Sequence, residues 1–383
     1  MENHSSPSNN QPAAKDPTTF VAFRHIPELD GLRGIAVLLV IALHAHIPFF
    51  LNRSIGVDLF FVLSGFLITS IMLKEWQKTK TISLPLFYSR RVLRLYPGLF
   101  FMIVGVCLHA IIFLPWLKTQ QTLITALLSF LFVGNWAEAY GLRDFGIFYH
   151  TWSLSIEFQY YLVWPFIVRT ILRSGFTIRA LIVMGIVAIV LIATRRFYCV
   201  SVLHLSSERV YLGLDTHSDG LILGGVIAML YSQGWLLRKR IGSLLINFLF
   251  GCSLIYYFCI MTRIIPSDNL PLWLHMSLVV TCTSFVLVWV ITAPPGRTAW
   301  LRWKPLVWIG TISYGLYLWN FPTTYILTIR ALPESVNIVL QVTCTFVAAV
   351  TSYYLIEKPF LMLKDRMKPG TMTTNQPSPE NVG

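Results

Sequence analysis

Two basic residues in the first long apolar segment have a spacing that suits a shared site. Arg33 and His44 lie eleven residues apart in LRGIAVLLVIALH. Eleven residues at 100° each make about three full turns, so both side chains lie on one helical face, about 16 Å apart along the axis. A guanidinium at the mouth and an imidazole near mid-membrane would then line one internal cavity. The alternative is that Arg33 reaches the lipid headgroups and His44 is a hydrogen-bonded packing residue.

Two acidic residues also stand inside apolar segments, where a charge is costly and needs a reason. Asp58 lies in GVDLFFVLSGFLIT, where it either pairs with a cation or stays at the interface. Glu157 lies in HTWSLSIEFQYYLVWPF, and its position implies a partner or a role in proton transfer. Further charged or titratable residues flank later apolar segments: Asp215, His217, Asp219, Glu357 and Lys358.

Three arginines lie close together in the segment FYSRRVLRLYP, which we expect to be a cytoplasmic loop. Arg91 and Arg94 are three residues apart, and Arg90 is four residues before Arg94, so a helical turn presents all three on one face. Guanidinium groups suit the recognition of phosphate. The alternative is that these charges only fix the orientation of the chain in the membrane.

The composition requires a membrane. Of the residues, 55% are hydrophobic and 12% charged, whereas a soluble domain has about 25% charged residues. The net charge of +13 comes from Lys and Arg in short segments between apolar runs, which is the positive-inside distribution and not that of a nucleic-acid binder. The six cysteines show no metal-ligand spacing, and the motifs of soluble enzymes are missing. We therefore expect an all-α, polytopic bundle of about ten transmembrane helices.

The positive-inside rule places both termini in the cytoplasm. An odd number of crossings must separate Arg94 from Trp152, so the apolar stretch 120–135 enters without crossing or lies at the interface. We expect residues 1–24 and 361–383 to be disordered cytoplasmic tails around a transmembrane domain at 25–360. The ten expected spans are 32–50, 56–73, 97–115, 150–168, 178–194, 217–233, 242–261, 272–292, 306–328 and 336–356.

Four segments together resemble the acyltransferase 3 family, membrane-bound acyltransferases that modify cell-surface polysaccharides and other small acceptors. In order and at family-like spacing, they are 28–44 (ELDGLRGIAVLLVIALH), 56–69 (GVDLFFVLSGFLIT), 87–97 (FYSRRVLRLYP) and 152–165 (WSLSIEFQYYLVWP). Weaker similarity follows at 215–225, 310–322 and 353–360.

The resemblance implies roles for particular residues. His44 matches a histidine central to acyl transfer, and Arg33 matches the arginine before it. Arg91 and Arg94 match an RxxR motif that handles acyl-CoA, with Arg90 beside it. Two positions depart from the family pattern: Asn320 stands where many members have histidine, and His217 where arginine is common. The remaining acidic positions matched to family motifs are Glu157, Asp219 and Glu357.

The expected function is therefore transfer of an acyl group, most simply acetyl, from cytoplasmic acyl-CoA to a hydroxyl of a carbohydrate or other acceptor. His44 would act as general base or transient acyl carrier, tuned by Glu157 or Asp58. Acyl-CoA is a substrate, and we expect no permanently bound cofactor, no metal and no nucleic acid. The expected location is a bacterial inner membrane.

Two other classes of function stay open. A transporter of lipid-linked glycans would also place charges at helix ends, but it would not release CoA. A structural or sensory membrane protein would need neither His44 nor the arginines. The sequence leaves open the acceptor, the acyl length and the oligomeric state. Because the chain ends at Gly383 without an esterase-like domain, we expect the stand-alone form of the family.

Overall fold

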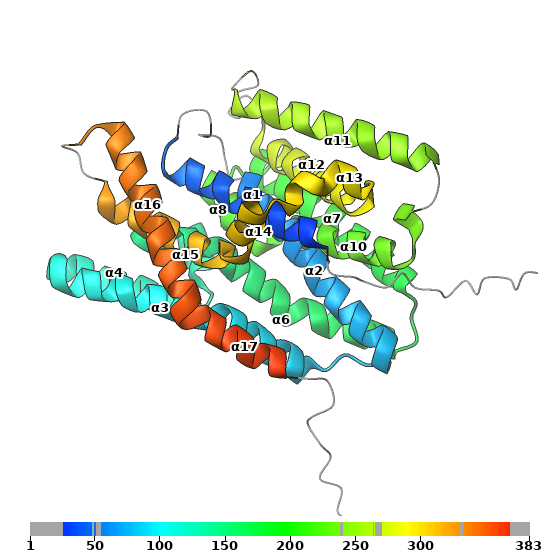
Figure 1. Cartoon of the computed structure of the whole chain (residues 1–383), viewed down its shortest axis with the longest axis horizontal. Coiled ribbons are helices and arrows are strands. Elements are labelled where there is room, and N and C mark those ends of the chain that lie inside the picture. Colours follow the sequence, from blue (N-terminus) through cyan, green and yellow to red (C-terminus); the bar gives the residue numbers. More distant parts are fainter. Residues whose placement is uncertain are drawn as a thin grey trace, which may run out of the picture.

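The computed structural model describes residues 26–47, 50, 55–237, 240–262, 264, 270–328 and 332–367. Every regular element in these residues is a helix, which confirms the all-α expectation (Figure 1). The expected tail at 1–24 lies outside the described residues, as do residues 368–383. The last described helix runs to Arg366, so the tail boundary expected at residue 361 falls inside a helix.

The helices follow one another along the chain with short connections. The first part of the chain contains α1 (Pro27–His44), α2 (Ile55–Thr79), α3 (Leu84–Phe113), α4 (Trp116–Phe130), α5 (Gly134–Ala139), η1 (Gly146–Thr151), α6 (Trp152–Arg173) and α7 (Ile178–Ser201). The second part contains α8 (Ser207–Leu212), α9 (Leu214–His217), α10 (Asp219–Ser232), η2 (Trp235–Leu237), α11 (Arg240–Met261), α12 (Leu272–Thr292), α13 (Pro295–Thr298), η4 (Ala299–Arg302), α14 (Lys304–Thr311), α15 (Ser313–Leu327), α16 (Glu334–Ser352), the π-helical turn η5 (Tyr353–Glu357) and α17 (Lys358–Arg366).

Six helical stretches within the described residues are long and apolar enough to cross a membrane. They are α2, α3, α7, residues Ser243–Met261 of α11, α12, and the continuous stretch Glu334–Arg366. The protein is therefore a polytopic membrane protein. Each of the ten expected spans overlaps a helix, although α10 has only 14 residues and α1 carries three charged residues in 18. The number of crossings stays a prediction.

The arginine-rich segment expected as a loop lies instead within the first half of α3. A proline near the first helical position starts this helix, and Pro97 inside it removes a hydrogen bond without ending it. After α3 the chain turns back, and α4 packs against α3. With 15 residues, α4 is about 22 Å long, shorter than the ~30 Å hydrocarbon core. This length suits the partial entry expected for 120–135.

Helix α2 lies at the centre of the bundle and is the most buried span. In its apolar stretch 78% of the residues are buried, against 11% in α11, whose apolar side chains face outward. Helix α2 packs closely against α10. A Cβ on Gly65 would lie 1.8 Å from the carbonyl oxygen of Leu221, so only glycine fits there. Small residues permit such a close approach of helices in membranes.

Candidate active site

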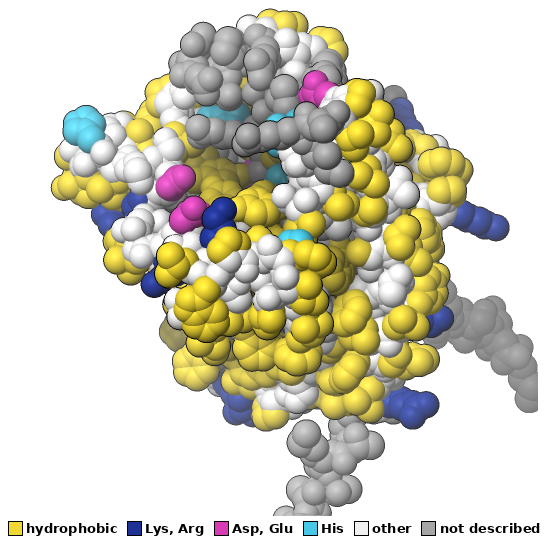
Figure 2. Space-filling model, turned by 90° about the vertical axis from the view of Figure 1, so that its left-hand side faces the viewer, with side chains coloured by type: hydrophobic (Ala, Val, Ile, Leu, Met, Phe, Trp, Pro, Cys, Tyr) yellow, Lys and Arg dark blue, Asp and Glu magenta, His cyan; other side chains and the backbone are white. Residues whose placement is uncertain are grey.

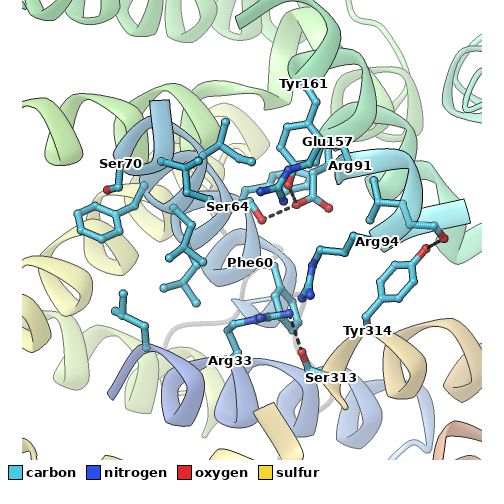
Figure 3. Close-up of a pocket in the computed structure, with 18 of the residues that line it drawn as sticks. Arg33, Phe60, Ser64, Ser70, Arg91, Arg94, Glu157, Tyr161, Ser313 and Tyr314 are labelled. Atoms are coloured by element: carbon cyan, nitrogen blue, oxygen red, sulfur yellow. Dashed lines mark hydrogen bonds between the residues drawn. The ribbon is translucent and has the colours of Figure 1, made fainter. Parts of the chain in front are cut away.

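A cavity of about 520 Å³ opens at the end of the bundle where α1 begins and α2 ends (Figure 3). Its lining extends along α2 from Val57 to Lys74, about 25 Å at the helical rise. Two carboxylates line it, Asp30 and Glu157. We call it the cation cavity, because five of its lining residues are basic: Arg33, Lys74, Arg91, Arg94 and Lys364.

The three arginines of this cavity come from two helices and point into the same space (Figure 3). Arg33 on α1 donates a hydrogen bond to Oγ of Ser313, at 3.1 Å. The guanidinium of Arg91 on α3 lies 5.6 Å from the ring centroid of Tyr161, and its buried Nε has no hydrogen-bond partner in the described part of the chain. The cavity therefore holds donor groups that an anionic ligand can use.

A second cavity, of about 290 Å³, lies at the other end of α1. Helix α1 ends at His44, and η1, α6 and α8 supply much of the remaining wall. Val57 and Tyr317 line both cavities, so the two spaces adjoin each other with these side chains between them. We call the second space the histidine cavity. Its other lining residues include His44, Tyr149, His150, Trp152, Glu208 and Tyr211.

The contacts of His44 fix the tautomer of its ring. Nδ1 forms a short hydrogen bond with Oδ1 of Asn320 on α15. The amide nitrogen of Asn320 donates to the backbone carbonyls of Leu316, at 3.1 Å, and of Tyr317, at 2.5 Å. Because carbonyl oxygens only accept hydrogen bonds, the amide cannot be turned around. Its oxygen must accept a hydrogen bond from Nδ1–H of His44, which leaves Nε2 with the free lone pair of a base or nucleophile.

Comparison with known proteins shows the family of this chain. The family model described as an acyltransferase domain, acyltransferase 3, matches residues 26–358. The chain belongs to the acyltransferase 3 family. It is 33% identical over 357 residues to the peptidoglycan O-acetyltransferase OatA of Listeria monocytogenes, which covers 89% of this chain and 57% of that protein. The putative peptidoglycan O-acetyltransferase YrhL of Bacillus subtilis is 32% identical over 88% of this chain and 55% of its own length.

The O-acetyltransferase OatA of Staphylococcus aureus is 30% identical over 88% of this chain and 57% of its own length. The chain thus spans little more than half the length of these curated relatives. No solved structure matches it.

Two expectations about His44 in this acyltransferase 3 chain need correction. The helix begins at Pro27, five residues before the expected span, and it ends at His44. A proline and two acidic residues in the first turn favour this early start, and His46 leaves the helical conformation with φ of 56°. His44 is therefore the last residue of α1, whereas the expected span 32–50 placed it inside the helix. Arg33 and His44 line two adjoining cavities instead of one.

Glu157 has the partners that its apolar surroundings demand. One of its carboxylate oxygens accepts short hydrogen bonds from the hydroxyls of Ser64 and Tyr161. Figure 3 places Arg91 beside it, in the cation cavity. Glu157 thus accompanies the arginines and does not line the histidine cavity. Glu157 therefore makes no hydrogen bond to His44 among the described residues, and the expected tuning of His44 by Glu157 would have to act at a distance.

Asp58 is also separated from His44, although both had been expected to act together. Its carboxylate lies 3.0 Å from Nε2 of His217, whose Nδ1 lies 2.6 Å from the carbonyl oxygen of Tyr211. Both ring nitrogens of His217 thus face oxygen atoms. Of the two alternatives for Asp58, the structure shows a buried carboxylate with a side-chain partner, His217.

Three more expected site residues lie outside both cavities. Asp219 forms an ion pair with Arg196, with 2.5 Å between its Oδ2 and Nη2 of the arginine, and both side chains are buried. Arg90 donates a short hydrogen bond to the carbonyl of Met367 beyond α17 and does not line the cation cavity. Arg91 and Arg94 do line it, so the expected cluster of three arginines contributes two to this cavity.

Glu357 lies in the π-helical turn between α16 and α17 and is buried. The hydroxyl of Ser352 donates to its carboxylate at 3.1 Å, and Arg94 is the cation that acts on it. It does not line the cation cavity, whereas its neighbour Tyr314 does. Glu357 can therefore hold Arg94 in position electrostatically from outside the cation cavity.

Sequence reasoning missed His150, which lines the histidine cavity together with His44. Its ring stacks on that of Phe321, with 5.4 Å between the ring centroids. The ring of His44 contacts the same phenylalanine edge-on, with 5.0 Å between the centroids. His150 is buried, and neither of its ring nitrogens has a hydrogen-bond partner among the described residues. The signal was present, because His150 opens the motif HTWSLSIEF.

Proposed function

We propose that this protein transfers an acetyl group from cytoplasmic acetyl-CoA to a hydroxyl of a cell-surface polysaccharide, and that both chain ends lie in the cytoplasm of a bacterial cell. The adjacency of the two cavities at Val57 and Tyr317 carries this proposal, because it brings a space lined by five basic side chains next to a histidine whose Nε2 is left with a free lone pair. Two of the relatives are named as a peptidoglycan O-acetyltransferase and a putative one, and these names support a cell-wall glycan as the acceptor.

The donor would occupy the cation cavity. CoA carries several phosphate groups, and five basic side chains against two carboxylates leave this cavity with a net positive charge. Arginine forks form charge-assisted, bidentate hydrogen bonds to phosphate, which are stronger than neutral ones. The length of the cavity along α2 lets the pantetheine arm extend from the basic end toward Val57.

The chemistry would take place at Nε2 of His44. As the acceptor oxygen bonds to the carbonyl carbon of the thioester, Nε2 takes the hydroxyl proton. The carbon–sulfur bond then breaks, and His44 returns the proton to the leaving thiolate, which departs as free CoA. Asn320 holds the ring in the tautomer that this step requires.

Purified full-length protein in proteoliposomes tests the activity directly. With acetyl-CoA on the side of the cation cavity and a glycan acceptor on the other side, we expect CoA release and acetylated glycan. A transporter would move its solute without releasing CoA, so the absence of CoA release would refute the acyltransferase. Mass spectrometry of surface glycans from cells with and without the gene then identifies the acceptor by its lost acetyl groups.

A further inference from the structure

The histidine cavity differs from its neighbour in charge. Among the described residues that line it, Glu208 carries the one formal charge at neutral pH, and none is Lys or Arg. The remaining polar groups are hydroxyls, the indole of Trp152 and two imidazoles. Aromatic rings form much of its wall, with Trp152 and Tyr211 in contact at 4.9 Å between centroids. Rings with a few polar groups are typical of small-molecule sites.

The size of the cavity limits what can enter. At about 290 Å³ it lies at the lower end of ligand pockets, which begin near ~300 Å³. It holds one ring of a sugar chain and not several. The side of the molecule shown in Figure 2 is hollowed, with hydrophobic and histidine side chains inside the hollow and both acidic and basic side chains at its edge.

The surroundings of Glu208 increase the negative charge at this end. The carboxylates of Asp144 and Glu208 both act on Glu138. Burial raises the pKa of Glu138 and the two neighbouring charges raise it further, against the hydrogen bond from the backbone N–H of Phe145 that lowers it. Three carboxylates therefore lie near one another beside the cavity.

The arginine that follows Glu208 in the chain pairs with a different carboxylate. The guanidinium of Arg209 donates to both oxygens of Asp215, at 2.9 Å each. Burial acts to raise the pKa of Asp215, but the hydrogen bonds and charges of Arg209 and Arg195 outweigh it and lower that pKa. Asp215 is thus ionised at neutral pH and holds two arginines, and none of these three residues lines the histidine cavity.

We propose that the histidine cavity is the acceptor subsite and that Glu208 makes it select an uncharged sugar ring over an anionic one. The inference rests on the proposed function, because His44 must meet the acceptor hydroxyl there. The C–H face of the sugar packs on the aromatic wall, and Glu208 accepts a hydrogen bond from a second hydroxyl or an amide N–H. A phosphate or carboxylate on that ring is repelled by the carboxylates at the mouth.

Binding measured without any acetyl donor tests this subsite. The full-length protein in lipid nanodiscs, free of sugar-based detergent, is titrated by calorimetry with a trimer of N-acetylglucosamine and with a trimer of galacturonic acid. We expect the uncharged trimer to bind at least tenfold more tightly. Glu208→Gln should weaken its binding about tenfold, since a hydrogen bond to a charged group is lost. Glu208→Lys should reverse the preference.

The matched control is Glu334→Gln. Glu334 is likewise an exposed carboxylate in the first turn of a helix, α16, but it does not line the cavity. Its substitution should leave both affinities unchanged. Equal affinities for the two trimers, no binding of the uncharged one, or an unaltered Glu208→Gln variant would each overturn the proposal. Because no acetyl-CoA is present, these outcomes are independent of CoA release, on which the proposed function depends.

Discussion

The cation cavity and the histidine cavity share Val57 and Tyr317, but the charge of their other lining side chains differs. One gathers five basic residues, and the other gathers aromatic rings around two histidines and a carboxylate. Helix α1 supplies a functional residue to each, with Arg33 near its start and His44 at its end. Under the proposed function, this difference divides two tasks: charged groups would hold the donor in one space, and uncharged, directional groups would position the acceptor in the other.

Loss of His44 should have the largest effect and should fall on the chemistry alone. We expect His44→Ala to lower kcat by about 10²–10⁴-fold, the usual contribution of a general base. The KM for acetyl-CoA should stay the same, because the cations that would bind the donor line the other cavity. Steady-state CoA release with a glycan acceptor measures both. Full O-acetylation by a properly inserted His44→Ala protein would refute the role of His44.

A bulky side chain at the junction should separate the two cavities. Val57 is buried and lines both, so Val57→Phe narrows the passage between donor and histidine. Displacement of reacting groups by about 1 Å can cost about 10²-fold in rate, and we expect a loss of that size in kcat. Acetyl-CoA should still bind with its normal Kd. Val62→Phe, at a fully buried α2 position outside both linings, controls for overpacking, and an equal loss there would argue against a passage at Val57.

The arginines should affect donor binding before they affect chemistry. Arg91→Ala with Arg94→Ala should raise the Kd for acetyl-CoA by about 10–100-fold, since each removes charge-assisted hydrogen bonds. The control is Arg90→Ala, because Arg90 donates to Met367 and does not line the cavity. Calorimetry with a non-hydrolysable acetyl-CoA analogue measures both variants. If Arg90→Ala weakens binding as much as the pair does, the cation cavity is not the donor site.

The sequence predicted the general class of this fold, and physical chemistry explains why. Lipid requires long apolar helices, so composition and run length were enough to predict an all-α membrane bundle. Helical spacing also placed Arg91 and Arg94 together, since neighbours on a helix are set by its geometry. The same reasoning did not foresee that α3 begins before the arginines or that α1 begins at Pro27.

Contacts between distant segments could not be predicted in this way. Asn320 lies 276 residues from His44, and its role as partner depends on how α15 packs beside α1. Arg90 donates to a carbonyl at the far end of the chain, beyond α17. His150 is in a 3₁₀ turn before α6, so helical periodicity gave no reason to place it in the site. Each of these depends on tertiary packing and not on local spacing.

Asn320 gives the smallest expected effect but the sharpest test of how the histidine cavity works. Asn320→Leu removes one hydrogen bond between uncharged groups, so kcat should fall by about threefold to tenfold. Acetyl-CoA affinity should not change. Asn320→Asp keeps an acceptor for Nδ1 of His44 but adds a negative charge beside the ring. That charge stabilises the protonated, inactive form of a general base.

The pH–rate profile distinguishes these roles. The rate falls as pH drops, because His44 must be unprotonated to accept the hydroxyl proton, and in Asn320→Asp this fall should occur at higher pH than in the wild type. Asn320→Leu should lower the plateau because the ring is no longer held in one tautomer. A residue that served only packing would change stability in both variants and leave the midpoint of the profile where it was. An unshifted midpoint in Asn320→Asp would therefore show that Asn320 does not control the reacting nitrogen of His44.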